Sequence, residues 1–262
     1  MPDQLFLEER RRAILHAIEK QGRVSVKDLS DDLHVSAVTI RQDLRALEAE
    51  GFLERTYGGA VRRASAATLP GQPELSFDVR RRRQDAEKQA IGQAAARLVR
   101  DGYGIALDAS TTAFAITPYL KRFDGLTIVT NSLIIAQQFL DAPRIQVLMP
   151  AGRLRRDSVS LTGSSATIPA INLNLGFFGA RGLSLTVGYC DITAEEAEMK
   201  RALIAHCQQS YVVIDSSKWG SVAPFTYCDA HNAAVITTER APHEHVEAFR
   251  AAGVSVETIA LR

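Results

Sequence analysis

Short polar segments in the second half of the chain have residue types that suit the binding of a small anion. Residues 108–112 read Asp-Ala-Ser-Thr-Thr, residues 130–132 read Thr-Asn-Ser, and residues 215–218 read Asp-Ser-Ser-Lys. Consecutive hydroxyl residues at the start of a helix favour a phosphate, because exposed backbone N–H groups and the helix dipole attract negative charge. The alternative is that Ser110 or Thr111 only caps the helix.

Each polar segment directly follows an apolar run of the kind that forms a buried parallel strand. The predicted strands are residues 103–108, 126–130, 145–149, 211–215, 233–237 and 254–259. Helical patterns alternate with them, near residues 111–122, 132–141, 193–207 and 243–252. A run of four arginines at residues 80–83 opens a further predicted helix that extends to about Arg100. This alternation predicts an α/β domain with a mostly parallel sheet.

The carboxyl ends of parallel strands meet at one edge of a sheet, so the polar segments are expected to line a single pocket there. Lys218 supplies positive charge for an anionic ligand in this interpretation. Lys200 is a further candidate, although an i, i+4 pair with Glu196 on the same helix is a simpler account of it. The candidate effector-binding residues are Asp108, Ser110, Thr111, Thr112, Asn131, Gly152, Lys200 and Lys218.

Residues 8–62 combine three helical patterns with a Gly-Gly turn. The first two predicted helices span residues 8–21 and 26–33, and the third follows Ser36, which is a favourable N-cap residue. The apolar positions that form a buried stripe on the third helix are Ile40, Leu44 and Leu47. A short second helix, a tight turn and a third helix that is apolar on one side only predict a helix-turn-helix.

A wing is predicted after the third helix, because residues 52–57 and 60–62 can form two short strands about Gly58 and Gly59. Arg, Gln and Thr side chains on the third helix can pair with base edges in the major groove. Wing residues can reach the phosphate backbone or the minor groove. The candidate DNA-binding residues are Ser36, Thr39, Arg41, Gln42, Arg45, Arg55 and Tyr57.

Charge composition by itself gives no support to nucleic-acid binding. The whole chain has a net charge of +1, and residues 1–63 contain eleven basic and eleven acidic residues. The DNA-binding hypothesis therefore depends on where the charges lie and on the helix spacing. Asp43 is expected to pair or cap within the domain, whereas Arg41 could contact a phosphate or form an ion pair within the domain.

The third helix and the wing resemble the signature of DeoR-family bacterial repressors. The resemblance is carried by residues 36–48, which read Ser-Ala-Val-Thr-Ile-Arg-Gln-Asp-Leu-Arg-Ala-Leu-Glu, by Gly51, and by residues 55–60, which read Arg-Thr-Tyr-Gly-Gly-Ala. One position departs from the family pattern, because Gln42 stands where the family usually has arginine. The resemblance implies a winged helix-turn-helix that binds a double-stranded DNA operator.

The second half resembles the C-terminal sensor domain of the same family, over about residues 76–250. The matching residues are Glu87, Lys88, Asp108, Ser110, Thr111, Thr112, Thr130, Asn131, Ser132, Gly163, Phe177, Gly179, Gly182, Lys200, Asp215, Ser217 and Lys218. In that family the domain resembles ribose-phosphate isomerases and binds phosphorylated sugars. The resemblance implies that residues 110–112 and Lys218 hold the phosphate, and that Asp108 and Asn131 face sugar hydroxyls or shape the pocket.

Three positions of the second half depart from the family pattern. Ser110 and Ala151 stand where the family usually has glycine, and Asn174 stands where it usually has aspartate. The first two changes tighten or reshape the expected pocket, so the particular sugar can differ from the common ones.

These observations predict a winged helix-turn-helix domain at residues 1–62, a linker at 63–76 and an α/β effector-binding domain at 77–262. The predicted function is repression of a carbohydrate-metabolism operon under the control of a phosphorylated sugar. The chain is expected to act in the cytoplasm as a homo-oligomer, dimer or tetramer, with no catalytic residue, cofactor or membrane segment. The three cysteines are widely spaced and give no zinc or disulfide pattern.

Two other functions stay open at this point. One is a sugar-phosphate isomerase or deaminase with an accessory DNA-binding head, which would need a carboxylate general base near the sugar carbonyl. The other is a DNA-binding module with a ligand-free oligomerisation domain.

Overall fold

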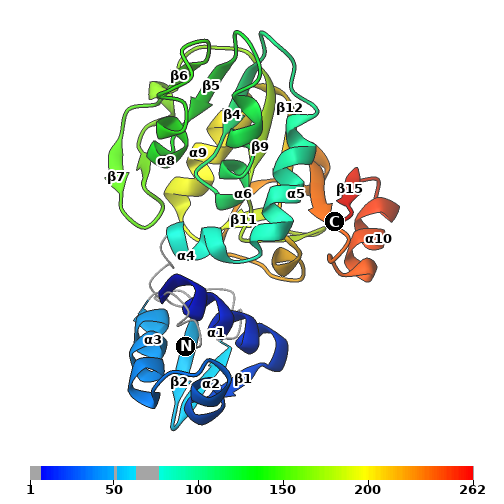
Figure 1. Ribbon diagram of the computed structural model, residues 1–262. Helices are drawn as coiled ribbons and strands as arrows, with labels where there is room; N and C mark the ends of the chain where they lie inside the picture. The colour runs from blue at the N-terminus through cyan, green and yellow to red at the C-terminus, as the bar shows by residue number, and fades with distance from the viewer. Residues whose placement is uncertain (1–6, 50–51, 63–76, 262) are drawn as a thin grey trace. The chain divides into compact units, whose positions relative to one another are not determined.

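The computed structural model describes residues 7–49, 52–62 and 77–261. The chain divides into two compact units, Met1–Ala66 and Ala67–Arg262, and each unit is described by itself (Figure 1). The predicted linker lies outside the described residues. In the described part of the chain, no helix has the length and apolar character needed to cross a membrane.

The first unit is a winged helix-turn-helix, as the sequence predicts. Within residues 7–49 and 52–62 its helices are α1 (Leu7–Gln21), α2 (Val26–Asp32) and α3 (Ala37–Ala49). Its antiparallel sheet has the order β1 (Arg23–Ser25), β3 (Gly59–Arg62) and β2 (Leu53–Thr56). β2 and β3 are the predicted wing, whereas β1 is absent from the sequence prediction because a strand this short shows no clear alternation.

α3 begins where its cap predicts. The backbone N–H of Thr39 donates a hydrogen bond to Ser36 Oγ at 3.1 Å, which satisfies a donor that the first helical turn leaves open. The turn before α3 contains His34 in the left-handed region, with φ of 52°. The buried side chains of this core include Ile14, Ile18, Ile40, Leu44 and Leu47. The predicted apolar stripe of the third helix is therefore confirmed.

The second unit is built on a parallel sheet, which confirms the predicted α/β class. Within residues 77–261, seven strands form this sheet and every neighbouring pair is parallel. Their spatial order is β15 (Val256–Ile259), β14 (Ala234–Thr238), β12 (Cys207–Val213), β9 (Leu173–Phe178), β4 (Gly104–Leu107), β5 (Thr127–Thr130) and β6 (Gln146–Leu148). The larger helices around it are α5 (Asp85–Ala96), α9 (Ala194–Ala205) and α10 (His243–Ala251).

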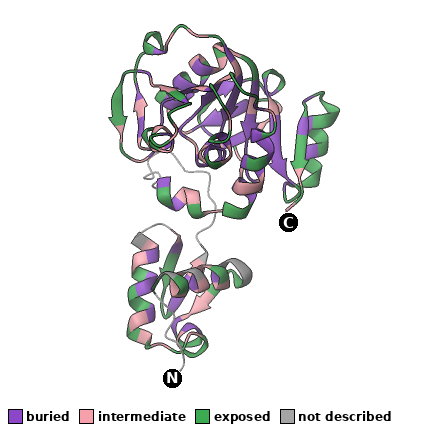
Figure 2. Ribbon diagram, turned by 45° about the horizontal axis from the view of Figure 1, so that its top comes forward, coloured by how far each residue is buried: buried purple, intermediate pink, exposed green. Residues whose placement is uncertain are grey.

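Buried residues fill both faces of the sheet (Figure 2). One core contains Phe178 of β9 together with Leu203 of α9 and Phe249 of α10. The other core contains Phe177 of β9 together with Ile91 of α5. Successive side chains of a strand point to opposite faces, so these two neighbouring phenylalanines enter different cores.

The central strand β9 is absent from the sequence prediction. Asn174 and Gly176 interrupt its apolar pattern, and both residue types are depleted in strands. In the structure, Asn174 Oδ1 accepts a hydrogen bond from the backbone N–H of Gly104 at 2.9 Å. A Cβ at position 176 would lie 2.4 Å from the ring of Phe178. Packing within the sheet thus requires Asn174 and Gly176, the same two residues that make β9 hard to recognise in the sequence.

The predicted single helix from residue 80 to residue 100 is wrong. The segment forms two helices, α4 (Phe77–Arg82) and α5, separated by Gln84 in the left-handed region with φ of 50°. The predicted helix at residues 111–122 also divides, into α6 (Thr111–Phe114) and α7 (Thr117–Leu120). Pro118 lies in the first turn of α7, where a proline is tolerated because its missing N–H has no helical partner to lose.

Two small antiparallel sheets are also absent from the sequence prediction. One pairs β7 (Arg153–Arg155) with β8 (Ser160–Thr162), and the other has the order β10 (Gly182–Ser184), β11 (Gly188–Asp191) and β13 (Phe225–Cys228). The backbone N–H of Leu161 donates to the carbonyl of Asn131 at 2.8 Å, which joins β8 to the segment after β5. That segment continues into α8 (Leu133–Gln137).

We expect Gly92→Ala to destabilise the second unit. A Cβ at this position of α5 would lie 2.3 Å from the carbonyl oxygen of Ala115, so the backbone would have to move. The expected loss in free energy of unfolding is about 1–3 kcal/mol, because overpacking outweighs the roughly 1 kcal/mol that alanine gains in helix propensity. Urea unfolding measures it, with Gln93→Ala as the control because Gln93 is exposed on the same helix. Equal stability of Gly92→Ala and the unaltered chain would contradict this contact.

Candidate functional site

The open face of α3 carries the side chains that the sequence predicts for base contact. Arg41, Gln42 and Arg45 are exposed there, and Thr39 is half-buried. Ser36 Oγ lies 2.9 Å from Thr39 Oγ1, so these two hydroxyls also stabilise the first turn of the helix. Arg41 forms no ion pair with any residue that the structure describes, which leaves its guanidinium available to a phosphate or base.

Asp43 lies on the opposite side of α3 and is 2% exposed. Its carboxylate accepts hydrogen bonds from Nε of Arg10 at 2.6 Å and from Nε of Arg11 at 3.2 Å, both from α1. The expectation that Asp43 pairs within the domain is therefore confirmed. Such a carboxylate fixes the position of α3 against α1 and so determines which face of α3 is open.

The wing is connected to α3 through Arg55. Its Nε donates to Glu48 Oε2 at 2.8 Å, and its backbone N–H donates to Glu48 Oε1 at 3.0 Å. The backbone hydrogen bond from Arg55, followed by its guanidinium, lowers the pKa of Glu48. Tyr57 lies at the tip between β2 and β3 with its side chain fully exposed. Arg55 therefore positions the wing against α3, and Tyr57 is the side chain that the wing tip exposes to solvent.

In the second unit, the loop after β4 is held by Asp108, which is 1% exposed. Asp108 Oδ1 accepts a hydrogen bond from the backbone N–H of Ser110 at 3.1 Å, and Oδ2 accepts one from the backbone N–H of Gly179 at 2.9 Å. Ser110 Oγ in turn accepts from the backbone N–H of Ala113 at 3.1 Å. The capping role of Ser110 is therefore confirmed, and the start of α6 has a fixed geometry.

Lys200 is buried beside this loop. Its Nζ lies 2.9 Å from Asp108 Oδ2 and 2.5 Å from Asp191 Oδ2, and it donates to the carbonyl oxygen of Gly179 at 2.6 Å. The simpler account, an intrahelical pair with Glu196, is wrong, because these partners lie on other elements. Burial by itself lowers the pKa of Lys200, but the carboxylates of Asp108 and Asp191 outweigh it and raise the pKa. Lys200 is charged and fully neutralised.

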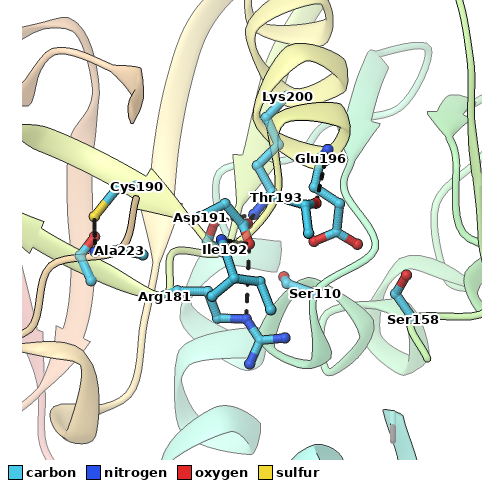
Figure 3. A network of polar contacts seen from close by, with 12 residues as sticks. Ser110, Ser158, Arg181, Cys190, Asp191, Ile192, Thr193, Glu196, Lys200 and Ala223 are labelled. Atoms are coloured by element: carbon cyan, nitrogen blue, oxygen red, sulfur yellow. Dashed lines mark hydrogen bonds and ion pairs between the residues drawn. The ribbon is translucent and has the colours of Figure 1, made fainter. Parts of the chain in front are cut away.

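Asp191 and Glu196 form a second acidic group near this lysine (Figure 3). Asp191 Oδ1 lies 3.9 Å from Nε of Arg181, and burial together with the Asp191 carboxylate raises the pKa of Glu196. Glu196 Oε1 is buried, has no hydrogen-bond partner among the described residues, and lies 3.8 Å from Nη1 of Arg155. In Figure 3 its carboxyl group points toward the side on which Ser110 and Ser158 lie.

Lys218 is the predicted cation that the structure leaves without a close partner. It ends the short turn Ser216–Lys218, which Asp215 caps by accepting from the backbone N–H of Ser217 at 3.0 Å. Its ammonium makes no hydrogen bond or ion pair within 4 Å of any described residue. Burial lowers the pKa of Lys218, Asp215 opposes this shift, and Arg181, Arg80 and Arg83 add to it. The surroundings of Lys218 therefore favour an incoming anion.

The remaining predicted residues lie on neighbouring segments. Asn131 is 3% exposed, and its Nδ2 donates to the carbonyl of Leu161 at 3.1 Å while its Oδ1 has no hydrogen-bond partner among the described residues. Thr111 and Thr112 are buried in the first turn of α6. Gly152 is exposed just before β7, where a Cβ would lie 2.6 Å from the carbonyl oxygen of Thr162. Asn131 offers a buried acceptor, whereas Gly152 permits the close approach of β8.

Sequence reasoning did not single out Arg155, Ser158 or Arg181. Arg155 and Ser158 lie in the β7–β8 hairpin, and Arg181 lies in the connection between β9 and β10, and the sequence predicted none of these strands. The sequence offers one local signal for Arg181. It precedes a glycine in a segment of small residues that follows the apolar run of β9.

Two family models match the chain in the places where these sites lie. The DeoR-like helix-turn-helix domain matches residues 10–66, and the DeoR C-terminal sensor domain matches residues 83–240. The chain belongs to the DeoR family. It is a DNA-binding transcriptional regulator, and the family resemblance expected from the sequence is confirmed.

Several DeoR-family relatives extend over most of this chain. The HTH-type transcriptional regulator GolR of Listeria innocua is 32% identical over 97% of this chain and 99% of its own length. A putative aga operon transcriptional repressor of Escherichia coli O157:H7 is 32% identical over 95% of this chain and 92% of its own length. The glycerol-3-phosphate regulon repressor of Escherichia coli K12 is 28% identical, with coverages of 81% and 82%.

Solved structures with a similar fold are more distant. Ribose 5-phosphate isomerase A of Methanocaldococcus jannaschii has a TM-score of 0.38 and 16% identity, and the match covers 52% of this chain and 54% of that chain. The translation initiation factor eIF-2B of Pyrococcus horikoshii has a TM-score of 0.42 and 16% identity, with coverages of 81% and 72%.

We expect Asp43→Asn to destabilise the helix-turn-helix unit. The change removes the charge that neutralises Arg10 and Arg11, and breaking a buried pair costs about 3–5 kcal/mol. Because both arginines retain some exposure, we expect roughly the lower end of this range or slightly less. Thermal unfolding of the full chain measures the effect, with Asp31→Asn as the control, because Asp31 is an exposed residue of α2 and the change removes the same charge. Similar losses in both variants would contradict a positioning role for Asp43.

Arg45→Ala is expected to weaken DNA binding without destabilising the fold. Loss of a base contact costs about 1–3 kcal/mol, whereas loss of a phosphate contact also lowers the salt dependence by about one charge. Fluorescence anisotropy measures this on a duplex that the unaltered protein selects from random sequences. Arg97→Ala removes the same charge from an exposed site in the second unit and serves as the control. Equal affinities of the two variants would exclude Arg45 from the interface.

Proposed function

We propose that this DeoR-family regulator represses a carbohydrate-metabolism operon and that a phosphorylated sugar bound in the second unit changes its affinity for DNA. The observation that carries the proposal is Lys218, whose ammonium makes no hydrogen bond or ion pair within 4 Å in the described part of the chain, and which has Arg181, Arg80 and Arg83 as well as Asp215 around it. A phosphate supplies the missing charge. The names of relatives support a carbohydrate-related role, since they include repressors of an aga operon and of a glycerol-3-phosphate regulon.

The proposed phosphate contacts are Lys218 and the hydroxyl groups and backbone N–H groups of residues 110–112. These segments follow β12 and β4, whose carboxyl ends lie on the same edge of the parallel sheet. Asn131 Oδ1 is buried and has no hydrogen-bond partner among the described residues, so we propose that it accepts a hydrogen bond from a sugar hydroxyl. Asp108 and Lys200 neutralise each other, so their part in the site is to shape the loop.

The regulator is proposed to act as a homo-oligomer, a dimer or a tetramer, that places two α3 helices on paired half-sites. Residues 1–62 then serve as the DNA-binding domain, residues 63–76 as the linker and residues 77–262 as the effector-binding domain. A ligand can change DNA affinity only if it binds one arrangement of the assembly more tightly than the other.

A thermal-shift panel of phosphorylated sugars tests the proposal. At a ligand concentration of 100 times Kd the expected stabilisation is about 2.7 kcal/mol, which raises Tm by several degrees. The panel includes ribose 5-phosphate, glucose 6-phosphate, fructose 6-phosphate and their unphosphorylated parents. Stabilisation by a phosphorylated member and not by its parent is the expected result. A panel without any stabilising member would contradict the proposed effector and favour a ligand-free oligomerisation domain.

Lys218→Ala with Thr111→Ala is expected to abolish that stabilisation while leaving DNA affinity intact. Each lost contact to a charged group removes about 1.5–3 kcal/mol of binding energy, so the double variant binds at least 100-fold more weakly. Lys121→Ala is the matched control, because Lys121 pairs with Asp141 at the surface, where such pairs contribute little. Unchanged sugar-phosphate affinity in the double variant would remove Lys218 and Thr111 from the site.

A further inference from the structure

The run of four arginines at residues 80–83 has no role in the proposed function so far. It lies on α4 and directly after it, and α4 is the first described element after residues 63–76 in chain order. α4 packs on α6 through Phe77, whose ring meets the ring of Phe114 edge-on at 5.5 Å. The guanidinium of Arg81 lies 5.6 Å from the same Phe114 ring. α4 thus contacts the helix that begins with the proposed phosphate loop.

Lys88 connects α4 to the other half of the proposed site. This α5 residue is 3% exposed, and its Nζ donates hydrogen bonds to the carbonyl oxygen of Arg80 at 2.6 Å and to that of Arg83. The same Nζ lies 3.9 Å from Asp215 Oδ2, at the start of the turn that carries Lys218. One buried ammonium therefore holds the end of α4 and lies close to the turn Ser216–Lys218, which is called the ligand turn below.

The neighbouring residue, Glu87, is fixed to the same turn. Glu87 Oε2 accepts a hydrogen bond from the backbone N–H of Ser216 at 2.9 Å, and Oε1 accepts one from Ser216 Oγ at 2.8 Å. Thr238 Oγ1 at the end of β14 donates to Glu87 Oε2 at 2.5 Å. Consecutive α5 residues thus hold the ligand turn and the end of α4 in a fixed relation.

Arg80 lies beside the same site, because Lys88 Nζ, which donates to the Arg80 carbonyl oxygen, is 3.9 Å from Asp215 Oδ2. Its guanidinium lies 5.7 Å from the Phe77 ring, on the helix that contacts α6. Burial lowers the pKa of Arg80, and the carboxylates of Glu196 and Asp191 act in the opposite direction. Arg80 and Arg83 also contribute to the lowered pKa of Lys218. Arg82, in contrast, is exposed. The two residues therefore differ in burial, because Arg80 is half-buried beside the turn Ser216–Lys218 whereas Arg82 is exposed.

We propose that Arg80 is a further ligand-binding residue, supplied by α4, and that Lys88 is the positioning residue that holds α4 at the site. Arg80 and Lys218 carry like charge, so an anion bound between them attracts both, in addition to the carboxylates that already act on Arg80. The preferred position of α4 then depends on ligand occupancy. Because α4 follows residues 63–76 in the chain, this dependence gives the ligand a direct route to the segment that leads to the DNA-binding unit. The inference rests on the proposed function.

Inorganic phosphate is a suitable probe, since it carries the charge of the proposed ligand without its sugar. In the full chain, phosphate is expected to slow amide hydrogen exchange in residues 77–82. Arg80→Gln should weaken phosphate binding about tenfold, as expected for one charge-assisted contact. Arg82→Gln is the matched control, because it removes the same charge from an exposed position of the same run. It should bind phosphate like the unaltered chain. Equal phosphate affinities of these two variants, or unchanged exchange in residues 77–82, would overturn the proposal.

Lys88→Met separates positioning from binding. This variant should keep phosphate affinity within about threefold, because Lys88 does not contact the ligand, yet phosphate should no longer slow exchange in residues 77–82. Retained protection of α4 in Lys88→Met would contradict the positioning role. The exchange measurement on the unaltered chain requires no variant, so the proposal can be tested even if Lys88→Met does not fold.

The outcomes distinguish this inference from the proposed function. If a sugar phosphate binds through Lys218 while Arg80→Gln and α4 exchange show no effect, only the role of α4 is refuted. If phosphate binds through Arg80 but no phosphorylated sugar stabilises the chain, the sugar effector is refuted and the role of Arg80 stands. If phosphate does not bind the unaltered chain at all, both are refuted.

Discussion

The proposed ligand site depends on a lysine ammonium that is buried at the carboxyl edge of the parallel sheet. Removing a charge from water costs several kcal/mol, so a buried lysine needs partners around it. Lys200 obtains them from Asp108 after β4, from the Gly179 carbonyl after β9, and from Asp191 at the end of β11. Segments that are distant in sequence therefore meet at one atom. This contact, through Asp108, holds the loop that starts at Ser110 in place.

Neutralisation of Lys200 explains why Lys218 can have a different role. Asp108 is engaged by Lys200 and Gly179, and Asp191 by Lys200 and Arg181, so neither carboxylate is the partner of Lys218. Asp215 acts on Lys218, but it also caps its own turn and lies 3.9 Å from Lys88 Nζ. These acidic residues thus hold the scaffold together, while positive charge remains on the turn Ser216–Lys218. This division is what an anion site requires before its ligand arrives.

The sequence predicted the elements whose determinants are local. Ser36 and the spacing of Ile40 and Leu44 specify α3 from adjacent residues, and six of the seven described strands of the large sheet follow from their apolar runs. β9 escapes such reasoning because Asn174 and Gly176 are selected by contacts with other strands. The partners of Lys200 and the approach of α4 to α6 are equally non-local. Residue types identified the candidate cations, but only the fold shows which of them is already neutralised.

The same argument resolves the charge balance of the first unit. Equal numbers of acidic and basic residues in residues 1–63 give no basic field when they are only counted. In the structure, Asp43 is enclosed by the arginines of α1, and Glu48 is engaged by Arg55 of the wing. Two acidic residues of α3 are thereby used inside the unit, whereas Arg41 and Arg45 remain exposed on its open face. A neutral unit therefore exposes a positively charged face of α3, because its internal ion pairs determine which charges reach the surface.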